Sequence, residues 1–143
     1  MKTAVMVTSM LARLTGLIQI VLGVLFWTGY AMSLIPIHIF SGIVLVLSLW
    51  TLAILAARAG VRPGLRILSL VWGLITLVLG LTQGQILGNS AHWIIQVIHL
   101  LVGLGAIGLA EMLAARIKHV QHIENMASDQ ASQPGRSNKG LTQ

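Results

Sequence analysis

Residues 36–57 read PIHIFSGIVLVLSLWTLAILAA, a run with no Lys, Arg, Asp or Glu and with one histidine near its start. About 20 such residues are what an α-helix needs to cross the hydrocarbon core of a bilayer. Pro36 stands where a helix tolerates proline best, in its first turn. This run therefore predicts a membrane-spanning helix.

Three further apolar runs, at about 10–32, 65–81 and 91–118, have the same character. The whole chain has 143 residues, of which 56% are hydrophobic and 8% charged, a composition that excludes an ordinary soluble domain. We therefore expect an all-α integral membrane protein, an up-down-up-down four-helix bundle covering residues 1–123. Residues 124–143 are rich in Ser, Gln, Asn, Gly and Pro, which predicts a disordered cytoplasmic tail.

The positive charge alternates along the chain. Lys and Arg cluster before or at the start of the first run, between the second and third, and after the fourth, while the other two connections carry no Lys, Arg, Asp or Glu. This positive-inside pattern predicts that both termini are cytoplasmic, and we expect a bacterial plasma membrane. The net charge of +6 does not indicate nucleic-acid binding, because no basic cluster is dense or interleaved with aromatic residues.

The chain also repeats itself. Gly16-Leu17-Ile18 followed by Val21-Leu22-Gly23 recurs 57 residues later as Gly73-Leu74-Ile75 and Val78-Leu79-Gly80. Ile37-His38 with Gly42 recurs 61 residues later as Ile98-His99 with Gly103. One helical hairpin is thus predicted to occur twice, in the same membrane orientation, with the copies related by an axis along the membrane normal.

The two repeated histidines are the main candidates for chemistry, because ionisable residues inside a membrane are costly and usually functional. The second and fourth helices are expected to be diagonal neighbours, so the repeat axis would bring His38 and His99 toward each other. His38 lies 20 residues from Arg58 and His99 lies 17 from Arg116, so their depths differ by only ~4.5 Å.

Two facing imidazoles at similar depth are the axial ligands that a six-coordinate haem b requires. The chain has no cysteine, which excludes thiolate ligands and covalent haem attachment. Gly42 and Gly103, four residues after His38 and His99 on the same helical faces, would make room for a flat macrocycle. The other interpretations of the histidines are structural hydrogen bonding, quinone contact and proton handling.

With these two His-x3-Gly motifs, the chain resembles small four-helix membrane b-type cytochromes, in which paired histidines on different helices hold haem. Such sites often have an arginine near the propionates, and the outer side of this chain has none. His92 and Gln96 share one stripe with His99 and Gly103. His92 is interpreted either as a residue that contacts the propionates or supports the ligands at the interface, or as an ordinary surface histidine. The other polar candidates for contact with the propionates are Gln83, Gln85, Asn89, Ser90 and Tyr30.

The leading hypothesis is a membrane haem b protein that transfers electrons, with His38 and His99 as the iron ligands. The candidate partners, besides the lipid bilayer, are a quinone, a redox partner protein, further copies of the chain or a larger complex, and an electron carrier or redox subunit is favoured over a stand-alone enzyme. The alternatives are a small transporter and a haem-free accessory subunit. The latter is suggested because Leu11-Ala12-Arg13-Leu14 before a Gly-rich helix looks like DoxX-type membrane proteins.

Overall fold

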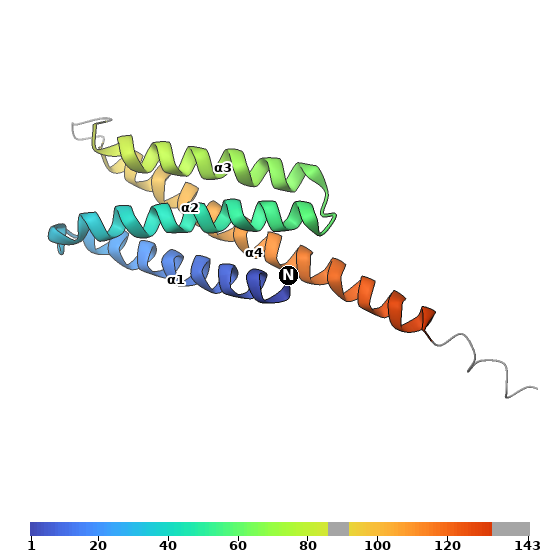
Figure 1. Cartoon of the computed structure of the whole chain (residues 1–143). Coiled ribbons are helices and arrows are strands. Elements are labelled where there is room, and N and C mark those ends of the chain that lie inside the picture. Colours follow the sequence, from blue (N-terminus) through green and yellow to red (C-terminus); the bar gives the residue numbers. More distant parts are fainter. Residues whose placement is uncertain (86–91, 133–143) are drawn as a thin grey trace, which may run out of the picture.

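Four α-helices make up the bundle in the part of the chain that the structure, a computed structural model, describes, namely residues 1–85 and 92–132 (Figure 1). They are α1 (Lys2–Trp27), α2 (Ile35–Arg58), α3 (Pro63–Thr82) and α4 (His92–Ala131), with short 3₁₀ turns η1 (Met32–Leu34) and η2 (Gln83–Gln85). No strand occurs in these residues. All four helices are long and apolar enough to cross a membrane. The all-α prediction is confirmed, and successive helices run in opposite directions in Figure 1.

Glycines with left-handed backbone conformations end α1 and α2. Gly29 has φ +78° and Gly60 has φ +71°. After α2, Val61 N–H donates to the carbonyl of Ala56 at 3.0 Å and Gly60 N–H to that of Ala57 at 3.2 Å, the bond pair of a Schellman motif. α2 therefore ends with Gly60 in the left-handed conformation. Pro63 then opens α3 in the first helical turn.

The ends of the outer helices differ from the predicted spans. α1 begins at Lys2 rather than near Met10, because Val5, Ser9 and Ala12 form a stripe of small side chains that is buried in the bundle. α4 continues to Ala131, so the prediction of disorder is wrong for residues 124–131. That segment contains no Gly or Pro, and the first helix breaker after it is Pro134. The rest of the predicted tail, 133–143, and the predicted start of the fourth span at 91 lie outside the described residues.

α2 and α4 lie on the short diagonal of the bundle. Each of them packs against the other three helices. Both helices contribute small side chains and leucines to the buried core cluster, which includes Leu49, Ala53, Ala56, Ala106, Ala110, Leu113 and Ala114. Small residues let two helix backbones approach closely in a membrane. This packing closes the half of the bundle that is nearer the basic connections.

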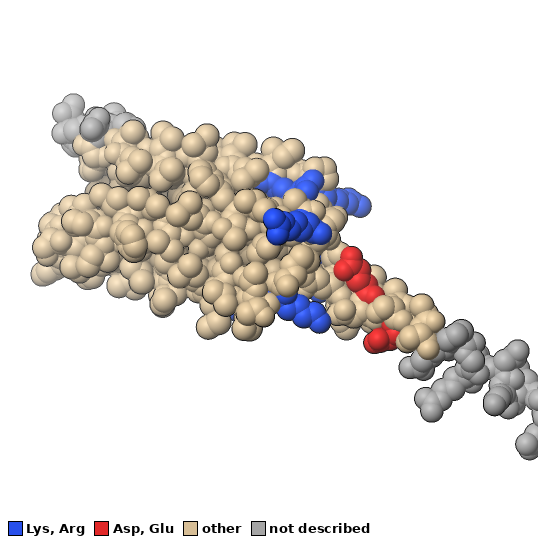
Figure 2. Space-filling view, viewed as in Figure 1, with Lys and Arg blue, Asp and Glu red and all other residues tan. Residues whose placement is uncertain are grey.

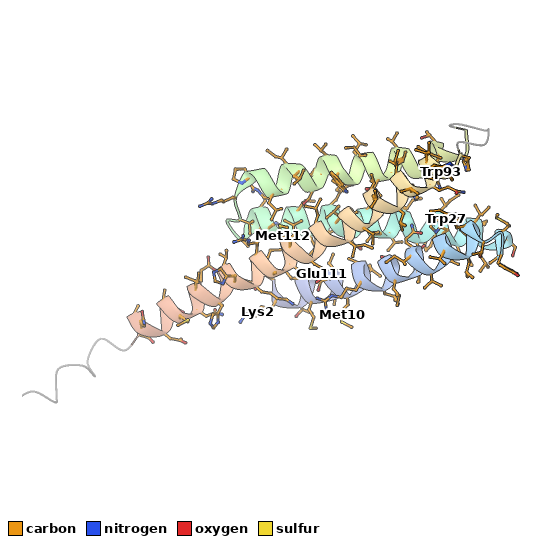
Figure 3. The ribbon with its side chains drawn as sticks, turned by 180° about the vertical axis from the view of Figure 1, so that it is seen from behind. Lys2, Met10, Trp27, Trp93, Glu111 and Met112 are labelled. Atoms are coloured by element: carbon orange, nitrogen blue, oxygen red, sulfur yellow. The ribbon has the colours of Figure 1, made fainter. Side chains whose placement is uncertain are left out.

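Large apolar side chains cover the outside of the bundle. On α3, for example, Ile67, Val71, Leu74 and Val78 are half or more exposed. Figure 2 shows Lys and Arg gathered at one end of the bundle and Asp and Glu on the part of α4 that projects beyond it. Trp27 of α1 and Trp93 of α4 lie at the other end, away from Lys2 (Figure 3). An apolar belt between a charged end and an aromatic end is compatible with an integral membrane protein.

An ion pair joins α1 to α4 on the surface of the bundle. The guanidinium of Arg13 donates from Nε to Glu111 Oε1 at 2.6 Å and from Nη2 to Oε2 at 2.7 Å. Arg13 is 14 residues from Trp27, or ~21 Å along the helix. The pair therefore lies within the apolar belt, where mutual neutralisation makes two opposite charges tolerable.

Two tryptophans form hydrogen bonds between neighbouring helices. Trp50 Nε1 on α2 donates to the Leu70 carbonyl on α3 at 3.2 Å, and Trp72 Nε1 on α3 donates to the Val102 carbonyl on α4 at 2.9 Å. In both cases the indole lies against a glycine three residues after the acceptor, Gly73 or Gly105. These hydrogen bonds satisfy the indole N–H groups in a region that offers them no water.

Gly105→Ala is expected to destabilise the bundle. A Cβ at this position would lie 2.7 Å from Cζ2 and Nε1 of Trp72, whose ring is held by its bond to Val102. Overpacking of this kind costs about 1–3 kcal/mol. The check is detergent-titrated unfolding followed by circular dichroism. The matched control is Gly108→Ala, whose added methyl meets nothing within 4 Å, and equal stability of the two variants would contradict the role given to Trp72.

Candidate functional site

A cavity opens among the four helices at the end of the bundle away from the basic residues. Its empty space, counted together with open solvent at its mouth, is about 1020 Å³. Both histidines singled out from the sequence line the cavity, together with residues of all four helices that include Gln19, Gly23, Phe26, Gly42, Leu45, Thr76, Gln83, His92, Gln96 and Gly103.

His38 and His99 face each other at the inner part of this cavity. Their ring centroids are 6.2 Å apart, with 57° between the ring planes. His38 lies in the first turn of α2, and His99 lies two turns into α4. The ring of Phe26 on α1 packs edge-on against His38, with the centroids 5.3 Å apart. Both imidazoles therefore stand between α2 and α4, where the closely packed half of the bundle ends.

Three buried polar atoms in this region have no hydrogen-bond partner among the described residues. They are Nδ1 of His38, Nδ1 of His99 and Oε1 of Gln19. A buried polar group without a partner costs about 1–3 kcal/mol, and folded proteins contain few of them. Three such atoms around one cavity are the pattern expected where a bound ligand, rather than the protein, completes the polar environment.

A second, smaller cavity of about 380 Å³ lies on the other side of the histidine pair, toward α3. Its other walls are mostly apolar and include Ile39, Ile43, Leu77 and Leu81. The two cavities share the residues Gln19, His38, Gly42, Thr76 and His99. The space around the two imidazoles thus extends to both sides of the pair.

The two glycines predicted to clear space for a macrocycle differ in their surroundings. A Cβ at Gly103 would meet nothing within 4 Å, so Gly103 borders open cavity. A Cβ at Gly42 would collide with Nε2 of Gln19, so the Gln19 amide lies in the space beside it. A flat ligand that reaches Gly42 therefore requires the Gln19 side chain to move.

The polar stripe predicted on the fourth helix lies at the cavity. His92 and Gln96 line it, with Gln83 beside them near the outer end. Tyr30 is 71% exposed and is not among the residues that line the cavity. Asn89, Ser90 and the side chain of Gln85 lie outside the described part of the chain.

On α1, Gln19, Gly23 and Phe26 form a similar stripe with spacings of four and three. Phe26 was not predicted from the sequence, although this spacing marks it.

The separation of the two rings is compatible with a metal held between two imidazoles. With metal–nitrogen bonds of about 2 Å, two imidazole centroids on opposite sides of one ion are about 6 Å apart. The observed 6.2 Å agrees with this separation. The described residues contain no group of three or more His, Cys, Asp or Glu side chains that could hold a metal.

No protein-family model, curated protein or solved structure matches this chain. The interpretation of the site consequently depends on its own geometry.

Gly103→Leu is expected to leave the stability of the bundle unchanged or to raise it by up to about 1 kcal/mol. The leucine would extend into open cavity, and glycine costs about 1 kcal/mol in the interior of a helix. The comparison is Gly16→Leu on α1, where the added Cβ would lie 2.9 Å from Ile107 and the variant should be destabilised. Unfolding titrations of both variants in detergent check this, and a strongly destabilised Gly103→Leu would show that the cavity is already filled.

Proposed function

We propose that this protein is a membrane b-type haem protein that takes part in electron transfer, with one haem held between His38 and His99. The observation that carries the proposal is the pair of imidazoles with ring centroids 6.2 Å apart beside a cavity, each with a buried Nδ1 that has no partner among the described residues. The duplicated His-x3-Gly motif supports it. Haem, when bound, supplies reversible one-electron chemistry, and the protein tunes it through ligation, burial and hydrogen bonding.

Each group of lining residues has a separate task in this proposal. His38 and His99 would hold the iron through their Nε2 atoms. Phe26 packs against the His38 ring and fixes its orientation. Gly103 leaves the open space that a macrocycle needs. His92 and Gln96 line the same cavity and are the partners proposed for the propionates, in place of the arginine often found near them.

The position of the site limits the direction of electron transfer. His38 lies 20 residues from Arg58, which is ~30 Å along α2. One cofactor at this depth does not span the bilayer, so electrons would be exchanged near the end that carries Trp27 and Trp93. The proposed partners are a membrane quinol, a redox protein outside the cytoplasm, or neighbouring subunits in a larger complex. The protein would act as an electron carrier or redox subunit rather than as a stand-alone enzyme.

The absorption spectrum tests the haem proposal directly. Protein purified from haem-replete membranes should show a Soret band that shifts on reduction. His38→Ala and His99→Ala should each lower the bound haem by about tenfold or more, because one of two iron ligands is lost. The matched control is His119→Ala, an exposed histidine on the projecting part of α4, which should retain the full band.

Two outcomes of this experiment would contradict the proposal. A colourless wild-type protein that is folded by circular dichroism would leave the transporter or accessory-protein interpretation in its place. A Soret band that survives both His38→Ala and His99→Ala would show that haem binds but that other residues ligate it.

The charge distribution also supports a proposal on orientation, with both termini in the cytoplasm of what we expect to be a bacterial plasma membrane. The absence of cysteine makes single-cysteine labelling clean. In intact cells a membrane-impermeant maleimide should label Tyr30→Cys and should reach Ser132→Cys only after permeabilisation. The reverse pattern would invert the orientation, and labelling of both positions in intact cells would place them on the same outer side.

A further inference from the structure

The atoms without partners around the two histidines are chemically complementary. Oε1 of Gln19 is an acceptor, while Nδ1 of an imidazole is a donor in the tautomer that leaves Nε2 free to bind a metal. All three residues that carry these atoms line both cavities. Within the described part of the chain, the site therefore contains one buried acceptor without a donor beside two nitrogens without acceptors.

Thr76 supplies a second acceptor in the same wall. Its side chain is buried, and its hydroxyl donates to the Trp72 carbonyl at 2.8 Å. The hydroxyl oxygen keeps its lone pairs free to accept a hydrogen bond. Gln19 and Thr76 are also equivalent residues of the predicted repeat, 57 positions apart. Each predicted hairpin thus contributes one histidine and one acceptor.

Contacts of two glycines indicate which of the two acceptors lies near which imidazole. The amide of Gln19 lies against Gly42, which is one turn after His38 on the same face of α2. Gly80, one turn after Thr76 on α3, faces His99, and a Cβ there would lie 3.3 Å from Cε1, the ring carbon between Nδ1 and Nε2. Gln19 is therefore placed beside the helix of His38, and Thr76 beside the ring of His99.

We propose that Gln19 and Thr76 are positioning residues for the two imidazoles. By side-chain rotation from their present positions, and without needing a ligand, Oε1 of Gln19 accepts a hydrogen bond from Nδ1–H of His38 and Oγ1 of Thr76 accepts one from Nδ1–H of His99. Metal-binding histidines almost always donate their second N–H to such a partner, which fixes the tautomer and the ring orientation. The inference extends the proposed function, because it explains how both Nε2 lone pairs are directed into the space between the rings.

The acceptors are uncharged, which has a consequence for the electronic properties of the site. A neutral amide or hydroxyl withdraws the Nδ1 proton less than a carboxylate does, so each imidazole stays a neutral ligand. Gln19→Glu would place a charged acceptor at His38, make that ligand more basic and favour the oxidised iron. The reduction potential of the haem-loaded variant should therefore be lower than that of the wild type.

The first test needs no haem. Nitrogen-15 NMR of histidine-labelled protein in nanodiscs reports the tautomer of each imidazole, with the signals assigned from His38→Ala and His99→Ala. Gln19→Leu should reduce the Nδ1–H tautomer at His38 alone, and Thr76→Val should reduce it at His99 alone. The matched controls are Gln121→Leu on the projecting part of α4 and Thr51→Val. Thr51 makes the same bond to its own helix but is exposed on the bundle surface.

The second test uses haem-loaded protein. Gln19→Leu and Gln19→Glu should shift the reduction potential in opposite directions, whereas Thr51→Val should leave it unchanged. The inference is overturned if Gln19→Leu and Thr76→Val change neither the tautomers nor the potential. Tautomer changes in a protein that binds no haem would sustain the positioning role and refute the proposed function, so the two failures are distinguishable.

Discussion

The close contact between α2 and α4 is the constraint on which the rest of the structure depends. Both helices contribute buried alanines such as Ala53, Ala56, Ala106 and Ala110 to the core, and small side chains of this kind let helix backbones approach closely. In the half of the bundle away from the basic connections, the same two helices carry His38 and His99 with a cavity beside them. Core packing in the half near the basic connections therefore sets the distance between α2 and α4. In the half with the cavity, that distance brings the two imidazoles face to face.

A second constraint comes from lipid, which offers polar groups no water to bind. Most polar side chains in the bundle are satisfied by the protein itself: Arg13 pairs with Glu111, Trp72 donates to a carbonyl on the next helix, and buried hydroxyls such as that of Ser69 donate to carbonyls of their own helix. Against this background the partnerless atoms of the histidine pair and Gln19 stand out. The free-energy cost of burying these polar atoms without partners is expected at a functional site, whose residues are selected for more than stable packing.

Much of the candidate site could be predicted from the sequence because the signals there are compositional. Two histidines inside apolar runs are rare, and their repetition with Gly42 and Gly103 indicated that they belong together. The glycines were less predictable, since a glycine in a membrane helix serves either packing or clearance. The structure gives Gly103 open space and places Gln19 against Gly42, a difference that depends on the rotamer of a side chain from another helix.

The sequence by itself determined the four apolar helices, the one-sided distribution of charge and the two histidines, because hydrophobicity and charge are properties of single residues summed along the chain. Tertiary structure alone decided how far α1 and α4 extend, that α2 and α4 form the short diagonal, and that the rings stand 6.2 Å apart beside a cavity. These features arise from contacts between residues distant in sequence. How far each helix is rotated about its own axis is set by packing against its neighbours and not by its local sequence.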